Sequence, residues 1–211
     1  MGLKNLTKYD TAIFHWLYDL TKHRDCRAIV WLSRTGDGYL YFVIGMLLMW
    51  FEPEHGEIFL YTALMAYGLE LPIYVVLKKA FKRPRPCDFL ANLTAHVTPS
   101  DKFSLPSGHT AAAWLMATII AFYYPSFALL AYTWASLIGL SRILLGVHYP
   151  TDVIAGAAAA NILLETASDS MGATKEAVDT IVAAIDPLVR TPDELDFRSR
   201  YEPVPPNERF E

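Results

Sequence analysis

Residues 58–86 read IFLYTALMAYGLELPIYVVLKKAFKRPRP, an apolar run that ends in a cluster of five basic residues. The apolar part is long enough for a helix to cross the ~30 Å hydrocarbon core of a bilayer, which takes roughly 17 to 25 residues. The basic cluster is explained either as an ordinary membrane flank or as a device that holds an anion. The remainder of the sequence decides between these two interpretations.

The composition places this stretch in a membrane protein. The chain has 211 residues, 53% of them hydrophobic and 13% aromatic, which is too apolar for a typical small soluble protein. We expect an all-α, polytopic membrane helical bundle with about five spans. The predicted spans are residues 39–51, 58–77, about 110–124, about 127–147 and about 151–164. The last of these is rich in Gly and Ala, which favours a helix packed inside the bundle, because small side chains let helix backbones approach closely.

Two regions flank this core. Near the N-terminus, apolar residues recur from Ile13 to Leu20 at the i, i+3, i+4, i+7 spacing of one helix face, as in amphipathic helices that lie in the headgroup layer. The C-terminal segment has ten acidic and five basic residues and one amphipathic helical pattern. We therefore divide the chain into an amphipathic interfacial region (1–38), a membrane core (39–167) and an acidic C-terminal tail (168–211).

The N-terminus has no pattern of a removable signal peptide, so membrane insertion is assigned to the internal spans. The two cysteines, Cys26 and Cys87, are too few for a metal framework and allow at most one disulfide; we interpret them as free thiols.

Three polar clusters stand at the ends of the apolar segments. The first joins Lys78 to Arg85 and Pro86, the second is LPSGHT at 105–110, and the third is SRILLGVHYPTD at 141–152. If successive spans alternate in direction, all three clusters lie on the same membrane face. This convergence favours a composite site over an ordinary basic flank.

The residues of these clusters indicate a phosphate site. Lys78, Arg85 and Arg142 supply positive charge, and the planar fork of Arg matches phosphate oxygens. Ser107 offers a hydroxyl, and Gly108 permits close approach of the backbone to an anion. The start of a helix near Ser107 adds a positive dipole end.

Two histidines in the clusters have the chemistry for phosphoryl transfer. One of them can attack phosphorus, and the other can protonate the departing oxygen. Asp152 follows His148 by four residues, so it can hold one ring nitrogen and leave the other free to attack.

The patterns Lys-x6-Arg-Pro, Pro-Ser-Gly-His and Ser-Arg-x5-His-x3-Asp resemble the three signature motifs of the type 2 phosphatidic acid phosphatase (PAP2) family. That family shares its site with vanadium haloperoxidases and bacterial class A acid phosphatases, and the resemblance covers roughly residues 58–165. It implies that His148 is the nucleophile that becomes phosphohistidine, that Asp152 orients it, and that His109 is the acid for the leaving group. The resemblance also implies five phosphate-binding residues and neither a metal nor another cofactor. They are Lys78, Arg85, Ser107, Gly108 and Arg142.

We therefore expect an integral membrane phosphatase that removes the terminal phosphate of a lipid phosphate or diphosphate. Undecaprenyl diphosphate, phosphatidylglycerol phosphate and phosphatidate remain open as substrates. A phosphotransferase that uses the same site and a non-catalytic membrane scaffold are the alternatives. The expected partners are the substrate and membrane lipids, with no nucleic acid.

Three further expectations concern the membrane. The basic residues on the site face favour a cytoplasmic site by the positive-inside rule, whereas the resemblance to bacterial membrane members implies an outward one. We expect a multi-pass protein of the bacterial inner membrane with the site facing outward. Lys79, Lys82 and Arg83 are interpreted as flank or headgroup contacts. Glu70 lies inside a predicted span, where an ionisable group is costly, and either an interaction within the bundle or substrate handling explains it.

Overall fold

The computed structural model describes residues 3–90, 93–99 and 101–161. Within these ranges the chain forms helices and loops, and its only β-type pairing is an isolated bridge between Pro84 and Phe103. The predicted all-α fold is therefore confirmed. The predicted acidic tail, 168–211, lies outside the described residues.

The helices follow the hydrophobic pattern of the sequence. They are α1 (Leu3–Asp19), α2 (Arg27–Arg34), α3 (Tyr39–Phe51), α4 (Gly56–Phe81), the short α5 (Pro86–Phe89), α6 (Gly108–Tyr123), the 3-10 turn η1 (Pro125–Phe127), α7 (Ala128–Leu144) and a helix at 150–161. Each of the five predicted apolar segments coincides with one of the longer helices of this core, from α3 onward.

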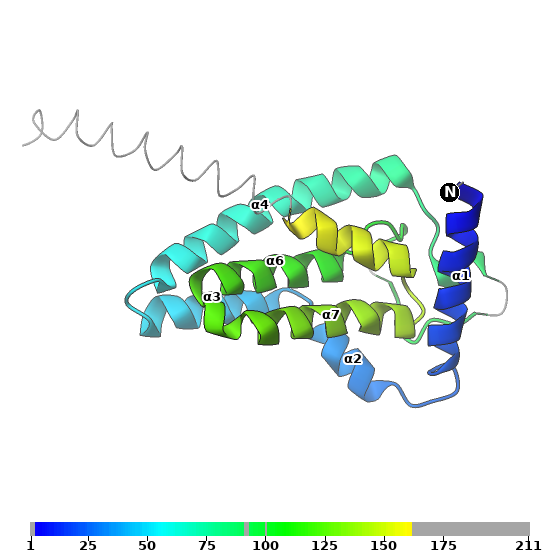
Figure 1. The fold of residues 1–211 in the computed structure, drawn as a ribbon, viewed down its shortest axis with the longest axis horizontal. Helices are drawn as coiled ribbons and strands as arrows, with labels where there is room; N and C mark the ends of the chain where they lie inside the picture. The colour runs from blue at the N-terminus through cyan, green and yellow to red at the C-terminus, as the bar shows by residue number, and fades with distance from the viewer. Residues whose placement is uncertain (1–2, 91–92, 100, 162–211) are drawn as a thin grey trace, which may run out of the picture. The chain divides into compact units, whose positions relative to one another are not determined.

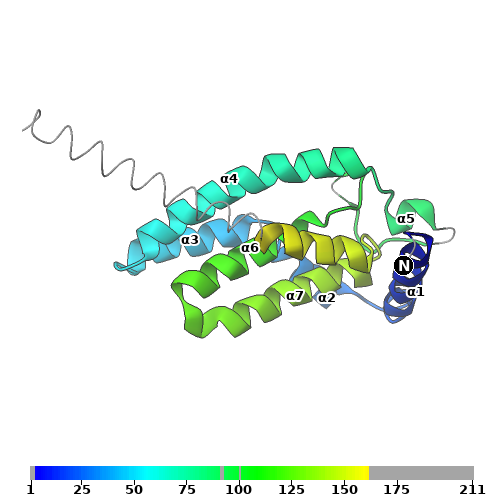
Figure 2. The same ribbon diagram turned by 45° about the horizontal axis from the view of Figure 1, so that its top comes forward.

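The long helices of the core run along roughly the same direction, and α1 crosses them steeply near one end (Figures 1 and 2). The most extensive contacts join α6 to α7 and α3 to α4. The C-terminal end of α4, the N-terminal end of α6 and the C-terminal end of α7 lie at the same end of the bundle as α1 (Figure 1). The polar clusters of the sequence are therefore gathered at this end.

Small residues allow the core helices to pack closely. Alanines of α4, α6 and α7 are buried together with Phe59 and Leu115. Gly156 of the 150–161 helix faces the start of α6, where an added Cβ would lie 2.6 Å from the carbonyl oxygen of Ser107. We expected the 150–161 helix to lie inside the bundle. This expectation is wrong for one side of the helix, because Ile154 on that side is 67% exposed. Only the face that carries Asp152, Gly156 and Ala160 is buried.

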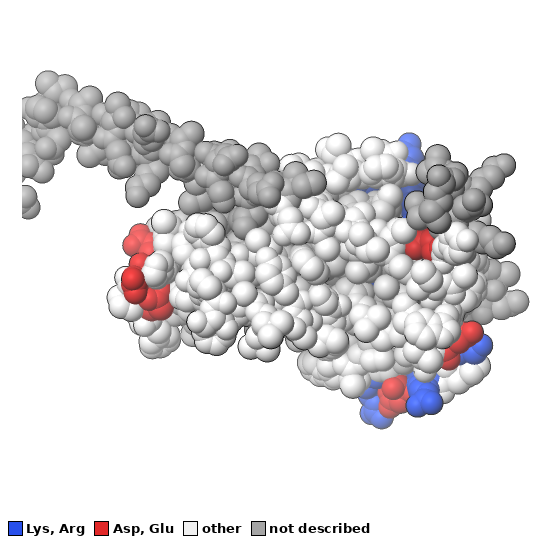
Figure 3. All heavy atoms as spheres, viewed as in Figure 1, with Lys and Arg blue, Asp and Glu red and all other residues white. Residues whose placement is uncertain are grey.

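The outer surface of the bundle is suited to lipid. Many large apolar side chains of α3, α4 and α7 are exposed, and the face seen in Figure 3 has charged residues only toward its two ends. Such a continuous apolar surface marks a membrane or protein contact in general. Two described segments, Gly56–Phe81 and Pro125–Leu144, are long and apolar enough to cross a membrane, whereas α3 and α6 are shorter. The number of five spans stays a prediction.

The N-terminal region packs against the core through a face that the sequence pattern did not indicate. Phe14 and Tyr18 of α1 are buried against Ile143 and Tyr149. Ile13, Trp16 and Leu20 of the predicted face are exposed, whereas Leu17 of that face is partly buried against the same cluster. That face is free to contact lipid, and its position in the headgroup layer stays a prediction.

Candidate active site

Lys78 and Arg85 share one carboxylate. Lys78 ends the apolar part of α4, and its Nζ donates to Asp101 Oδ1 at 2.6 Å and to the carbonyl of Phe103 at 2.8 Å. Arg85 follows in the loop after α4 and donates from its Nη2 to the same Asp101 oxygen at 2.9 Å. Burial alone would raise the pKa of Asp101, but the hydrogen bond and charge of Lys78, with the charge of Arg85, lower it to about 2. Asp101 is therefore a permanent anion between two cations.

Arg85 also reaches the predicted nucleophile. Its Nη1 donates to the carbonyl of Val147 at 2.9 Å and lies 3.1 Å from Nε2 of His148. A guanidinium only donates hydrogen bonds, so Nε2 of His148 is the acceptor and carries a lone pair. The ring proton then resides on Nδ1, which lies 3.5 Å from Asp152 Oδ2. At this distance Nδ1 makes no hydrogen bond within the described part of the chain, and the contact to Asp152 is electrostatic.

The surroundings of His148 keep the ring neutral. The residue is 1% exposed. Burial, followed by the positive charges of Arg85, Arg142 and Lys78, holds the pKa of His148 well below its ordinary range. A neutral imidazole with a free Nε2 lone pair is the form that attacks phosphorus. The left-handed turn at Gly146, with φ of 80°, brings the chain back from α7 to place His148 there.

Asp152 is fixed by a residue that was interpreted as a membrane flank. Arg83 donates from Nη1 to Asp152 Oδ1 at 2.8 Å and from Nη2 to Asp10 of α1. Its guanidinium also lies 4.1 Å from the centre of the Tyr149 ring. The second oxygen of Asp152 accepts a hydrogen bond from the backbone N–H of Tyr149 at 2.8 Å. The interpretation of Arg83 as a flank or headgroup contact is therefore wrong, since the residue links α1 to Asp152.

The second motif begins α6. Ser107 is fully buried; its N–H donates to the carbonyl of Asp152 at 3.0 Å, and its hydroxyl accepts from Thr110 at 2.9 Å. Gly108 has a further reason to be glycine, because an added Cβ would lie 2.7 Å from the ring of Tyr74. As the first residue of α6, Gly108 has no carbonyl partner for its N–H within the helix, and this leaves a donor for an anion.

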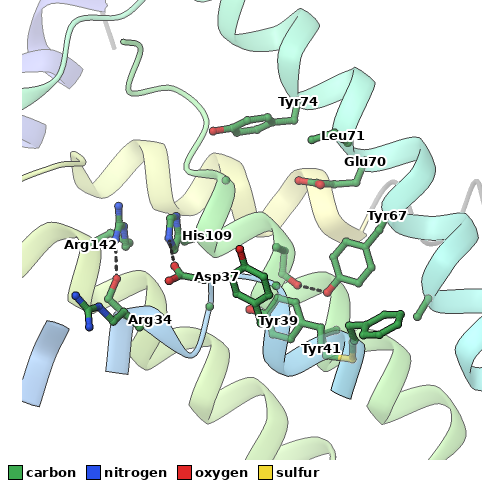
Figure 4. A pocket seen from close by; sticks show the side chains of 18 of the residues that line it. Arg34, Asp37, Tyr39, Tyr41, Tyr67, Glu70, Leu71, Tyr74, His109 and Arg142 are labelled. Atoms are coloured by element: carbon green, nitrogen blue, oxygen red, sulfur yellow. Dashed lines mark hydrogen bonds and ion pairs between the residues drawn. The ribbon is translucent and has the colours of Figure 1, made fainter. Parts of the chain in front are cut away.

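His109 and Arg142 have partners from the N-terminal region. His109 Nε2 lies 2.8 Å from Oδ1 of Asp37, in the loop between α2 and α3. Arg142 Nη1 donates to the hydroxyl of Ser33 in α2 at 2.6 Å, and its Nε has no hydrogen-bond partner among the described residues. Figure 4 shows His109 beside Asp37, with Arg142 near them. The cavity at this place has a volume of about 870 Å³. His109 and Arg142 line this cavity together with Gly108.

The structure thus brings the eight predicted residues to one end of the bundle. Hydrogen bonds and short ion contacts link Lys78, Arg85, His148, Asp152 and Ser107 in one network, and Gly108, His109 and Arg142 form the adjoining cavity wall. Sequence reasoning gave no site role to five polar residues that complete the site, because none of them stands at a position that the motifs specify. They are Asp10, Ser33, Asp37, Arg83 and Asp101. Among the described residues, one set of converging metal-ligand atoms occurs, Glu52, Glu54 and His55, in the loop between α3 and α4 and outside this network.

Known proteins resemble the chain over this same region. A family model described as the PAP2 superfamily matches residues 58–168. A lipid A 1-phosphatase of Rhizobium etli is 32% identical over 104 residues, which are 47% of this chain and 44% of that protein. The matched part is therefore less than half of the length of that relative.

Two solved structures are similar over more of the chain. The crystal structure of Aquifex aeolicus LpxE has a TM-score of 0.63 and 27% identity, and the match covers 75% of this chain and 94% of that one. A transmembrane PAP2 type phosphatidylglycerolphosphate phosphatase from Bacillus subtilis has a TM-score of 0.62 at 24% identity, over 80% of this chain and 87% of that one. The second likeness concerns the fold alone.

Proposed function

The chain belongs to the PAP2 superfamily, and on that premise we propose that it is an integral membrane phosphatase that hydrolyses the terminal phosphate of a lipid through a phosphohistidine. The observation that carries the proposal is the state of His148, which is neutral, buried and protonated on the nitrogen that faces Asp152. The same match makes a metal-free reaction the expectation, with Lys78, Arg85 and Arg142 neutralising the charge of the phosphoryl group.

In the first step the Nε2 lone pair of His148 attacks phosphorus, and the bond from phosphorus to the lipid oxygen breaks. His109 gives a proton to that oxygen, so the lipid leaves as an alcohol or a lipid monophosphate. Arg85 transfers its Nη1 hydrogen bond from His148 to a phosphoryl oxygen, which frees Nε2. The phosphate takes the place of the Asp101 carboxylate on Lys78 and Arg85.

In the second step a water molecule attacks the phosphohistidine. His109, now neutral, accepts a proton from this water, and the bond from phosphorus to Nε2 breaks. Inorganic phosphate leaves, and His148 returns to its initial form. Asp37 holds His109 in position through both steps, as Asp152 does for His148.

The cavity supports a lipid as the substrate. Its walls change from His109 and Arg142 at the polar end to Leu60, Leu64 and Met116 on α4 and α6. Leu64 is also exposed on the outer surface, so the cavity meets the apolar exterior at α4. A lipid chain can remain in the bilayer while its headgroup reaches the histidines.

The test uses the purified full chain and a lipid phosphate labelled with ³²P on its terminal phosphate. We expect free ³²P-phosphate in excess EDTA, together with an acid-labile label on His148 after a rapid quench. Label transferred to a second lipid would favour the phosphotransferase, and no turnover of any lipid phosphate would favour the scaffold. Loss of turnover in EDTA that magnesium restores would contradict the metal-free site.

We further propose that the site faces outward from a bacterial inner membrane. Cys87 is half-buried in α5, close to Arg85, whereas Cys26 is buried. In intact cells that carry the Cys26→Ser variant, a membrane-impermeant maleimide is expected to label Cys87. Labelling only after the membrane is opened would place the site in the cytoplasm, as the positive-inside count indicates.

A further inference from the structure

Glu70 projects into the cavity from α4 (Figure 4). The residue is 7% exposed, and no hydrogen bond or ion pair joins its carboxylate to any residue in the described part of the chain. A buried carboxylate without a partner is costly in a membrane bundle and marks a functional position by default. The interpretation of Glu70 as part of an ion pair or hydrogen bond within the bundle is therefore wrong for the described residues.

The two tyrosines of α4 that line the cavity beside Glu70 donate their hydroxyl groups to acceptors other than Glu70. Tyr67 donates its hydroxyl to the carbonyl of Ala112 at 2.8 Å, and Tyr74 donates to Asp101 at 3.0 Å. Tyr41 also lines the cavity, and its buried hydroxyl has no partner among the described residues. Apart from Nε of Arg142 and Nε2 of His96, which also lack partners among the described residues, the cavity wall offers two unmatched polar groups, the carboxylate of Glu70 and the hydroxyl of Tyr41. A ligand with hydroxyl groups satisfies both.

Glu70 is also correctly placed relative to the phosphate site. Glu70, Tyr74 and Lys78 follow one another at intervals of four residues, so they lie along one side of α4. Eight residues of helix span about 12 Å, which is more than a bare phosphate covers. A headgroup whose phosphate lies at Lys78 extends along this side of α4 toward Glu70.

We propose that Glu70 and Tyr41 form a headgroup subsite for a lipid whose phosphate is carried on a hydroxylated group, a glycerol or a sugar. This inference rests on the proposed phosphatase function and names its substrate class. The carboxylate of Glu70 accepts hydrogen bonds from hydroxyl groups of the headgroup, and the hydroxyl of Tyr41 donates to one of them. A prenyl diphosphate has no alcohol hydroxyl to offer to Glu70 or Tyr41. Phosphatidate has no hydroxyl donor in its headgroup.

The test compares two substrates that differ by one hydroxyl group, phosphatidylglycerol phosphate and its 2-deoxyglycerol analogue with the same acyl chains. Wild-type protein is expected to prefer the hydroxylated substrate by about 100-fold in kcat/KM, since a site built for a hydroxyl leaves its own polar groups unpaired when the hydroxyl is missing. Undecaprenyl diphosphate, as a third substrate, is expected to be hydrolysed no better than the deoxy analogue.

Glu70→Leu is expected to remove most of this preference, mainly by lowering kcat/KM for the hydroxylated substrate, and Glu70→Gln to retain part of it. Glu57→Gln is the matched control, because Glu57 is an exposed carboxylate in the first turn of the same helix. Equal losses on both substrates would show a merely structural role for Glu70, and an unchanged preference would remove Glu70 from the subsite. If the wild-type protein hydrolyses none of the three lipids, the phosphatase function itself fails, which is a different result from hydrolysis without preference.

Discussion

The two histidines of the site have opposite surroundings. His148 is fully buried behind Arg85, and the residues around it come from α4, the 141–152 motif and the loop that carries Asp101. The side chain of His109 is 22% exposed, lines the cavity and has Asp37 as its partner. Asp37 lies outside the segment 58–168 that the family model matches. The proposed nucleophile, His148, is thus held mainly by the matched segment, whereas the proposed acid, His109, has its partner in the N-terminal region.

The burial of His148 and the position of His109 at the cavity support the proposed roles of nucleophile and acid. A nucleophile has to be neutral, and burial among cations keeps His148 in that form. An acid has to meet the leaving group, which arrives through the cavity that His109 lines. Burial and the charge of Arg142 lower the pKa of His109 to about 4, although Asp37 acts in the opposite direction, so the acid form of His109 requires the negative charge of a bound phosphate.

The largest expected effects come from substitution of the two histidines, and substrates with different leaving groups distinguish the two variants. His148→Ala is expected to abolish turnover of every substrate and the acid-labile label, because the nucleophile is missing. His109→Ala is expected to lose about 100- to 10,000-fold on a lipid phosphate and much less on p-nitrophenyl phosphate, whose leaving group needs no proton. Rapid-quench kinetics on both substrates measure the difference. A substantial turnover in His148→Ala, or equal losses in His109→Ala, would break the assignment.

Substitution of Arg142 tests whether this cation at the cavity wall binds phosphate through the shape of its guanidinium. Arg142→Lys is expected to reduce kcat/KM by about 10- to 100-fold, because a point cation cannot reproduce the two-pronged contact of the guanidinium with phosphate. Arg34→Lys is the matched control, since Arg34 lines the same cavity but is exposed and stacks on Trp31. Steady-state kinetics in detergent suffice. An Arg142→Lys variant as active as the Arg34→Lys control would indicate that Arg142 acts only through its charge.

Asp37 tests whether the N-terminal region completes the site. Asp37→Asn is expected to lower kcat on a lipid phosphate by about 10-fold with little change in KM, as for loss of one hydrogen bond to a charged group. The loss is expected to vanish on p-nitrophenyl phosphate, because Asp37 acts through His109. Asp25→Asn provides the control, since Asp25 pairs with exposed Arg27 away from the histidines. A loss that is the same on both substrates would mean that Asp37 only supports the fold.

The smallest expected effect concerns stability and pH. The pKa of His148 is lower in the folded protein than its ordinary value of about 6.5, so below this pH the unfolded chain binds more protons than the folded one. The stability that His148 contributes is therefore present above pH about 6.5 and is lost as the pH falls, by up to about 1.4 kcal/mol per pH unit. Asp101, with a pKa of about 2, loses its contribution only in a more acidic range.

Thermal unfolding in detergent between pH 7.5 and 5 measures this effect, with pH values chosen to bracket the ordinary histidine pKa of about 6.5. The melting temperature of the wild-type protein is expected to fall more steeply than that of His148→Asn. His23→Asn, at an exposed histidine of the N-terminal region, is expected to behave as the wild type does. Parallel curves for wild type and His148→Asn would contradict the buried neutral form of His148.

The sequence by itself determined the helices and the eight motif residues. Apolar runs such as 39–51 and 58–77 are local signals, and α3 and α4 follow them closely. The motifs carry chemistry through residue identity and spacing, as in Lys78 and Arg85 or His148 and Asp152. The face of α1 that packs on the core was not predictable in this way, because hydrophobic periodicity does not distinguish a face toward protein from a face toward lipid.

Only the tertiary structure decided which charges meet. Arg83 resembles a membrane flank in the sequence, yet it joins Asp152 to Asp10 across the fold. Asp37 carries no local pattern, and Glu70 is marked in the sequence only by its place inside an apolar run; the proposed roles of both depend on the cavity that they share with His109. The physical reason is that helix formation depends on residues three or four positions apart, whereas a buried charge is stabilised by whichever partner the packing brings within hydrogen-bond distance.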